Sequence, residues 1–449
     1  MARKPINRRL NVIHPNCAGI DIGKSKHYVA VDPQRDNAVR SFDAFTDDLE
    51  AIAAWLTECQ VETVAMEANS VYWIPLYEVF DRAGFEVHLV NPKATKQVSG
   101  RKSDVLDCQW IWQLMSYGLL EGAFRPADEV CALRAYVRQR ARLVKDAARA
   151  IQHMQKALVE MNLQLDNVLS DLMGKTGQLI LRAIVAGERD GAVLARLRDR
   201  RVKADEHTIA RSLKGNWRAE HLFALEQALA RYDYFQSQIS GCEQRIADVL
   251  ADLPQQATGA VPLAQPGRTQ QQRTMQRALR EVIGVDLTAI PTIGVETALT
   301  IVSEIGDDLS RFPFCEHFCS WLTLAPGTRI SGEKCLGGRT RKKTNRASQA
   351  LRLAAVKAGR SQSVIGAAHR ARLRRTARQT ARHQSHCPPA RAAGLRHDDA
   401  RTGIRGPRHR RVRIRMAGTP NSQPQAQRQE SRILRDPRAA RISSVSYVL

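Results

Sequence analysis

Apolar and polar residues in the first quarter of the chain alternate between a strand period and a helix period. Strand-like apolar runs, each closed by turn residues, occupy residues 18–22, 28–32, 39–45, 61–67 and 85–90. Between them, apolar residues three and four apart predict one helix over 49–59, a second after Pro75 and a third from Ser103. Strands that alternate with helices indicate an α/β layer domain, which we place at residues 17–127.

The middle of the chain keeps the helical period almost without interruption over residues 128–253. Two apolar seams, at 133–165 and 222–246, advance in steps of three, four and seven, as in a coiled coil. A charged segment at 188–214 separates the two seams. This pattern predicts an antiparallel pair of long helices or a dimerisation arm.

Residues 254–277, rich in Gln, Pro and Gly, predict a linker, and a mostly α-helical domain follows at 278–365. Within that domain, residues 287–305 predict a helix, a tight turn and another helix. This arrangement is similar to a helix-hairpin-helix, whose turn amides and helix N-terminus meet a phosphate. Thr292 stands where that motif usually has its first glycine, which weakens the match.

The net charge of +24 points to nucleic acid as a partner, because neutralising phosphates drives such binding. The charge is uneven, since residues 358–449 contribute +17 and residues 1–357 only +7. Residues 1–16 form a basic, polar lead that we expect to be disordered. No apolar run is long enough to span a membrane and no secretory leader follows Met1, so we expect a cytoplasmic protein without membrane contact.

The chain has nine cysteines, an odd number spread along its length, which argues for reduced thiols. Cys315, Cys319 and Cys335 allow a zinc site as one interpretation. Their spacing differs from the usual paired C-x-x-C, and buried thiols are the interpretation we favour.

Residues 366–449 contain no lysine and no sustained apolar period, but many Arg, Pro, His, Gln and Ser. One hypothesis is that this tail is out of frame, translated after a small insertion or deletion in a GC-rich gene, which could leave the product inactive. The alternative is a native, disordered, Arg-rich tail that binds nucleic acid. We favour the first.

Asp21 lies inside the first apolar run, between two isoleucines. An ionised carboxylate in a buried strand is costly unless it is paired or bound to a metal. Gly19 and Gly23 on either side let the backbone pass close to another element and then turn. Asp21 is therefore a candidate cation ligand, and the alternative is a turn or capping aspartate.

Three more carboxylates follow, one at the end of a predicted strand and two on one face of a predicted helix. Glu67 ends the fourth strand-like run, and Asp104 and Asp107 are spaced i, i+3, on one face of a helix. Two like charges on one face repel unless a cation lies between them. The alternative is that both acids simply favour the N-terminal end of the helix dipole.

Ser331 lies in a glycine-marked loop within a cluster of cations. A serine among cations can be a nucleophile whose alkoxide and target phosphate are both stabilised, or a turn serine in a loop that grips phosphate. The candidates for contact with nucleic acid are Lys102, Arg329, Lys334, Arg339, Arg341, Lys342 and Lys343.

The four acids, in the order Asp, Glu, Asp, Asp, resemble the metal site of RuvC-like nucleases with an RNase H fold. More specifically, the chain resembles the DEDD transposases of bacterial insertion sequences, of the insertion-sequence-110 type, which are related to the Piv/MooV DNA invertases. The resemblance covers residues 14–365. The matching words are Gly19-Ile-Asp-Ile-Gly23, Ala65-Met-Glu-Ala68 with Tyr72-Trp73, Val90-Asn-Pro92, Gly100-Arg-Lys-Ser-Asp104 with Asp107, Ile290-Pro-Thr-Ile-Gly294, and Ala325-Pro326 with Ser331-Gly332.

This resemblance implies a RuvC-like α/β domain whose first and fourth strands are neighbours, which would bring Asp21 and Glu67 together. It implies that the four acids hold Mg²⁺, and that Ser331 attacks a DNA phosphodiester to form a phosphoserine link. The acids and the serine would share one composite site. The resemblance further implies a homo-oligomer, a dimer or tetramer formed through the coiled coil, and a structured guide RNA, the bridge RNA. Such a protein would work at the bacterial nucleoid.

Other functions are consistent with parts of the pattern. Gly-Ile-Asp-Ile-Gly also opens the phosphate-binding hairpin of actin-like and sugar-kinase ATPases, but those need a second glycine-rich loop and an adenosine pocket, and we find neither. A RuvC-like, metal-dependent nuclease without serine chemistry is a second alternative. A non-catalytic nucleic-acid-binding protein with structural acids is a third.

Overall fold

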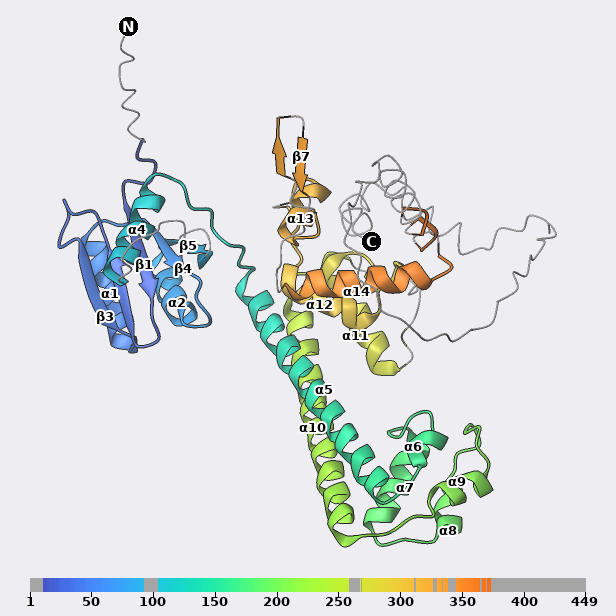
Figure 1. Cartoon of the computed structure of the whole chain (residues 1–449). Helices are drawn as coiled ribbons and strands as arrows, with labels where there is room; N and C mark the ends of the chain where they lie inside the picture. Colours follow the sequence, from blue (N-terminus) through green and yellow to red (C-terminus); the bar gives the residue numbers. More distant parts are fainter. Residues whose placement is uncertain are drawn as a thin grey trace, which may run out of the picture. The chain divides into compact units, whose positions relative to one another are not determined.

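A computed structural model describes most of the chain (Figure 1). The described residues are 11–92, 104–257, 267, 269–310, 312–325, 329–332, 334–337, 345–363, 366–368 and 370–372. Contacts divide the chain into two units, Met1–Arg125 and Pro126–Leu449. Most of the predicted lead and nearly all of the predicted Arg-rich tail lie outside the described residues, so the hypotheses about them stay predictions.

The first unit contains a five-stranded mixed sheet in the order β3-β2-β1-β4-β5. β1 pairs antiparallel with β2, and β2 with β3, whereas β1 with β4 and β4 with β5 are parallel pairs. The expected neighbourhood of the first and fourth strands is therefore confirmed. The strands are β1 (Cys17–Ile22), β2 (Lys26–Ala30), β3 (Val39–Asp43), β4 (Thr63–Glu67) and β5 (Glu86–Val90).

Helices cover both faces of this sheet. Helices α1 (Thr46–Glu58) and α2 (Trp73–Ala83) pack against one face, where Ile20 and Ile22 of β1 are buried. Helix α4 (Asp104–Ser116) covers the other face. Because side chains alternate along a strand, β1 contributes its even-numbered residues to one core and its odd-numbered residues to the other. The predicted α/β layer domain is thus confirmed.

The second unit contains two long helices, α5 (Asp128–Glu160) and α10 (Ala219–Asp252), which pack side by side along their length (Figure 1). Leu133 of α5 shares a core with Ile246 of α10, while Met154 shares another with Leu225. The two helices therefore run antiparallel, and the predicted antiparallel pair is confirmed within one chain. None of the described helices is long and apolar enough to cross a membrane.

Four short helices join α5 to α10, and the last two of them lie within the charged segment at 188–214. Their Ile180, Leu194 and Ile209 are buried in one core with Met154 of α5 and Leu225 of α10. Asp190 and Asp205 cap α8 and α9 by accepting hydrogen bonds from the amides of Ala192 and Thr208. The four helices are α6 (Leu165–Val168), α7 (Lys175–Val185), α8 (Gly191–Ala195) and α9 (Glu206–Ser212).

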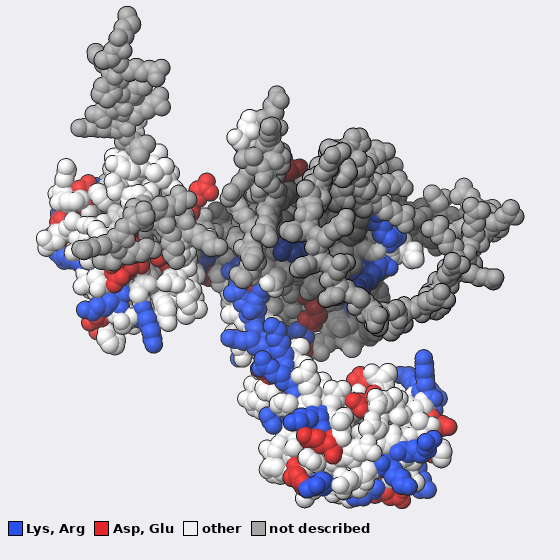
Figure 2. Space-filling view, viewed as in Figure 1, with Lys and Arg blue, Asp and Glu red and all other residues white. Residues whose placement is uncertain are grey.

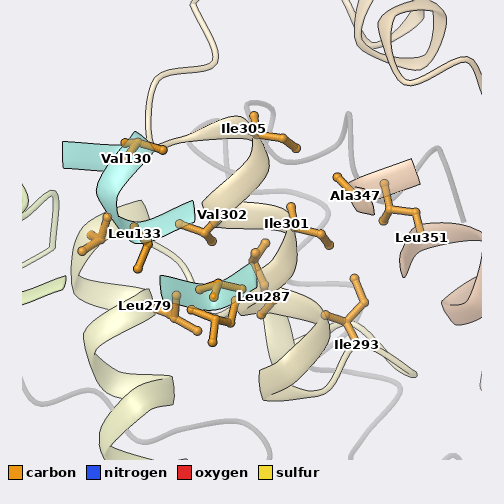
Figure 3. Packing of buried hydrophobic residues seen from close by; sticks show 14 of the residues in the cluster. Val130, Leu133, Leu279, Leu287, Ile293, Ile301, Val302, Ile305, Ala347 and Leu351 are labelled. Atoms are coloured by element: carbon orange, nitrogen blue, oxygen red, sulfur yellow. The ribbon is translucent and has the colours of Figure 1, made fainter. Parts of the chain in front are cut away.

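The C-terminal elements pack around the beginning of α5, whose Val130 and Leu133 lie in one core with Leu279 and Val302 (Figure 3). The first of these helices begins at residue 270, inside the predicted linker, because Thr269 and Gln272 form a capping box. The elements are α11 (Gln270–Ile283), the 3₁₀ turn η1 (Leu287–Ala289), α12 (Val295–Ile305), α13 (Cys315–Trp321), β6 (Arg329–Ser331), β7 (Lys334–Gly337) and α14 (Arg346–Arg360).

The predicted helix, turn and helix over residues 287–305 differs from the structure in its first part, which is only the 3₁₀ turn η1. The turn itself needs a left-handed residue, and Thr292 supplies it with φ of +77°. A β-branched residue rarely adopts this conformation. The Thr292 hydroxyl donates a hydrogen bond to the carbonyl of Ala354 in α14, at 2.9 Å, which ties the turn to the core.

We expect Thr292→Gly to retain a higher free energy of unfolding than Thr292→Ala, by about 1 kcal/mol or more. Both substitutions remove the hydroxyl, but only glycine removes the cost of the positive φ. Chemical denaturation of both variants measures the difference. Equal stabilities would contradict the left-handed backbone at this position.

Candidate active site

Asp21 and Glu67 stand near the ends of two neighbouring parallel strands. Gly19 lies opposite Ala65 in the β1–β4 pair, and Asp21 and Glu67 each follow two residues later. Because residues two apart along a strand point to the same face, both carboxylates lie on the face that α4 covers. The strand register thus places the first two predicted site residues together.

The backbone of α4 crosses β1 at Gly19. A β-carbon at residue 19 would lie 2.1 Å from the backbone nitrogen of Trp112 and 2.5 Å from the carbonyl oxygen of Cys108. Only glycine leaves room for this crossing, so the expected close approach at Gly19 is confirmed. Asp104 and Asp107 occupy the first turn of α4, immediately before Cys108, and the crossing holds that turn beside Asp21.

The pKa of Asp21 reflects the nearby carboxylates. Its pKa is raised from 3.8 to about 6, first by burial and then by the negative charges of Glu67, Asp104 and Asp107. Asp21 is half-buried, and each neighbouring carboxylate disfavours its ionised form. All four predicted acids therefore interact electrostatically, although they come from two strands and a helix.

Four carboxylates form a set of hard oxygen donors, which suits a divalent cation of the Mg²⁺ type. Within the described ranges, no three His, Cys, Asp or Glu residues already stand in a metal-binding arrangement. The other three acids thus act on Asp21 without the four forming a coordination shell. A bound cation would favour the ionised form of Asp21, whose pKa is raised by burial and then by its neighbours, so the donor set fits such an ion.

Ser331 belongs to the second unit, where β6 and β7 form an antiparallel hairpin. Ser331 pairs with Lys334 at the end of the ladder, and its side chain is exposed. Gly332 follows with φ of +58°, a conformation that favours glycine in tight hairpin turns. The expected glycine-marked loop is therefore a hairpin tip that presents Ser331 to solvent.

The predicted cations around Ser331 are described only in part. Arg329 and Lys334 lie on β6 and β7, the two strands of the same hairpin. The remaining candidates for contact with nucleic acid lie outside the described residues, and they are Lys102, Arg339, Arg341, Lys342 and Lys343.

Two residues near Asp21 were not among the candidates predicted from the sequence. Tyr28 of β2 is the direct cross-strand partner of Asp21 and shares its face of the sheet. Cys108 is buried, and its pKa is raised to about 12, first by burial and then by the charge of Asp21. Its thiol therefore stays protonated at neutral pH and is a poor metal ligand. The sequence places Cys108 directly after Asp107, so its nearness to the acids could have been predicted. The position of Tyr28 opposite Asp21 depends on the register of the β1–β2 hairpin, which the sequence alone does not give.

Cys315 and Cys319, considered for a zinc site, lie one turn apart on α13. Both are free and only half-buried, so the expectation of buried thiols is wrong for this pair. The side chain of Cys335 lies outside the described residues. Glu316 shares the same helix, and burial raises the pKa of Cys319. These groups give no support to the zinc interpretation.

Comparison with known protein families gives two matches. A family model for DEDD transposases of the IS110 type, described as "Transposase", matches residues 18–163. A second model, described as "Transposase IS116/IS110/IS902 family", matches residues 286–370. The search of curated proteins gave no match. Together the two family matches include the four acids, α5, the turn at Thr292 and the hairpin of Ser331.

Asp21→Asn is expected to stabilise the metal-free protein at pH 8 by about 1–2 kcal/mol, because burial and then the neighbouring acids raise the pKa of Asp21 from 3.8 to about 6. This range is below the full conversion of the shift, because solvent screens a side chain that is only half-buried. The folded pKa lies above the unfolded value. The penalty is therefore absent at low pH, grows as the pH rises above 3.8, and is complete above about 6. Denaturation in chelator at pH 4 and pH 8 measures it. Asp43→Asn, at the exposed end of β3, is the matched control, and equal gains for both variants would contradict the cluster.

Gly19→Ala is expected to destabilise the first unit by about 3 kcal/mol or more, since the new methyl group would collide with the backbone of α4. Thermal unfolding measures the loss. Gly241→Ala in α10 is the control, because a β-carbon added there would meet nothing within 4 Å and alanine favours a helix. A fully stable Gly19→Ala variant would rule out the close crossing.

Proposed function

The chain belongs to the IS110 family of DEDD transposases, and from this premise we propose that it is a DNA recombinase that cuts and rejoins strands for an insertion sequence. We propose that its α/β unit is a RuvC-like domain of the RNase H type. The strand order β3-β2-β1-β4-β5, with two antiparallel pairs on one side and two parallel pairs on the other, supports this assignment.

One observation carries the proposal: Asp21 and Glu67 share the sheet face that α4 covers, and the charges of Glu67, Asp104 and Asp107 all act on Asp21. The charges of three carboxylates act together on a fourth, Asp21, which is half-buried. Ionising a half-buried carboxylate beside other acids lowers the free energy of unfolding. A reaction on phosphate that uses a bound cation would account for such an arrangement.

We propose that these four carboxylates hold Mg²⁺. Two ions in such a site can clamp the attacking and leaving oxygens of a phosphodiester, which is the chemistry the metal supplies. Asp21 and Glu67 are held by neighbouring strands, and the Asp104–Asp107 pair by the first turn of α4. The close backbone contact at Gly19 supports this assignment, because it sets α4 directly against β1, the strand that carries Asp21.

We propose Ser331 as the nucleophile. Its oxygen would form a bond to the phosphorus of a DNA phosphodiester and lose its proton, while the displaced sugar hydroxyl would leave with a proton. The exposed position at the hairpin tip supports this role, because a duplex or strand can approach it. The basic residues of the hairpin and of the following segment (Arg329, Lys334, Arg339, Arg341, Lys342 and Lys343), together with Lys102, are our candidates for contact with DNA phosphates.

Further parts of the proposal rest on membership of the family. A structured guide RNA, the bridge RNA, would pair with target and donor DNA. The helical arm of α5 and α10 would serve as a coiled coil in a dimer or tetramer. With DNA as the substrate, the protein would work at the bacterial nucleoid.

A second candidate is a metal-dependent nuclease without serine chemistry. The observation in its favour is that all four acids belong to the first unit, whereas Ser331 belongs to the second. A complete set of metal ligands in one unit is sufficient for hydrolysis by an activated water. The two functions differ in whether a covalent protein–DNA adduct forms.

We expect Asp21→Asn and Ser331→Ala each to lower Mg²⁺-dependent cleavage of the element's ends by at least about 10³-fold, as when a metal ligand or nucleophile is removed. Denaturing gels measure cleavage, and retention of radiolabelled DNA on the denatured protein measures the adduct. The wild type should form the adduct and Ser331→Ala should not.

Asp43→Asn and Ser320→Ala are the controls, as both residues are exposed and lie outside the proposed site. Cleavage that survives Ser331→Ala would favour the nuclease without serine chemistry. Cleavage that survives Asp21→Asn would refute the metal site.

A further inference from the structure

Helix α5 carries a line of exposed basic side chains, Arg142, Lys145, Arg149 and Lys156, which we call the basic stripe. Their spacing of three, four and seven places them on one face of the helix. Over residues 138–156 the helix has six basic residues and one acid, Asp146. Figure 2 shows Lys and Arg gathered along this arm.

Other arginines of α5 account for its structural ion pairs. Arg138 forms two hydrogen bonds, of 2.8 and 2.9 Å, with the buried Glu304 of α12. Arg140 bridges Glu243 of α10 and Glu296 of α12, each at 2.7 Å. These side chains join α5 to α10 and α12. The basic stripe contributes nothing to those pairs, so its charge is available for another purpose.

Acids neutralise the basic stripe only weakly. Arg149 pairs with Asp146 at 3.0 Å and Lys156 with Glu160 at 3.6 Å, in each case with the basic side chain more than 70% exposed. Such exposed pairs are largely screened by water and salt. Among the residues that the structure describes, no carboxylate forms an ion pair with Arg142 or Lys145.

The composition of the stripe distinguishes between classes of partner. Protein interfaces depend on aromatic and apolar anchors at their centre. The stripe has none, and the position between Arg149 and Lys156 is Gln152, also exposed. From Arg142 to Lys156 the helix rises about 21 Å. The first three charges lie about 5–6 Å apart, and Lys156 follows Arg149 by about 10 Å. A row of point charges on a straight rod matches a regular row of phosphates.

We propose that the basic stripe binds the sugar-phosphate backbone of a double-stranded nucleic acid that lies along α5. This inference rests on the proposed function and adds a surface remote in sequence from the acids and from Ser331. About 21 Å covers more than half of the roughly 34 Å helical repeat of a duplex, so three or four phosphate contacts are available. Duplex DNA and duplex RNA share this chemistry.

The test compares the full-length protein with a stripe variant, Arg142→Gln, Lys145→Gln and Arg149→Gln, in binding to 20-base-pair DNA and RNA duplexes in EDTA. Loss of three phosphate contacts should reduce the slope of log affinity against log salt by about 2–3, and the affinity in 0.1 M salt by about 10²-fold. Loss with one duplex alone would support the stripe and identify which nucleic acid it takes.

A matched control removes three exposed arginines elsewhere, Arg218→Gln, Arg231→Gln and Arg245→Gln. It should lower the slope far less, because the proposal depends on position rather than on net charge. Both triple variants should unfold at the wild-type temperature. An equal effect of the two triples, or an unchanged slope in the stripe variant, would overturn the proposal.

Light scattering tests the alternative partner, a second copy of this chain that offers the acidic surface of α10, which has six acids and two arginines. Dissociation of an oligomer in the stripe variant, with duplex binding intact, would also overturn the proposal. Because binding is read without metal, its outcome is independent of cleavage. Loss of cleavage in Asp21→Asn therefore tests the function, and the salt slope tests the stripe.

Discussion

The first unit depends on a contact between backbones, where α4 crosses β1 at Gly19 with no side chain between them. This contact holds Asp104 and Asp107 beside Asp21, against their electrostatic repulsion. Packing of α4 on the sheet, with Ile111 and Met115 fully buried, supplies the opposing free energy. The folded chain thus bears a local electrostatic cost at Asp21, and the cation binding that we propose would reduce it.

In the second unit, hydrophobic contacts and ion pairs hold the long helix α5 against the C-terminal core. Val130 and Leu133 of α5 are buried in the C-terminal core. Arg134 and Arg138, on the next turns of α5, donate hydrogen bonds to the buried Glu304. Buried ion pairs of this kind need every charge to be matched, and removal of one partner is costly. That requirement accounts for Arg134 and Arg138, which both bind Glu304, whereas the basic stripe takes no part in these pairs.

The proposed chemistry is divided between these two units. The acids belong to a strand-and-helix scaffold in which the register fixes their spacing, and Ser331 belongs to a short hairpin whose tip is exposed. A rigid metal site suits the phosphate, because its geometry tolerates little error. A hairpin tip suits a nucleophile that must be reached by a large substrate. The two family matches likewise fall on separate parts of the chain.

Most elements could be predicted from the sequence alone, because hydrophobic periodicity and turn residues act over a few residues. Sequence also supplied the four acids, Ser331 and the close approach at Gly19, since these depend on residue type. Only the tertiary structure decided what Gly19 approaches, that Tyr28 is paired with Asp21, and that residues 165–212 share a core with the facing ends of α5 and α10. It also decided that Thr292 takes a glycine-like conformation, held by the hydrogen bond that its hydroxyl donates to α14. These features arise from contacts between residues distant in sequence, which no local pattern encodes.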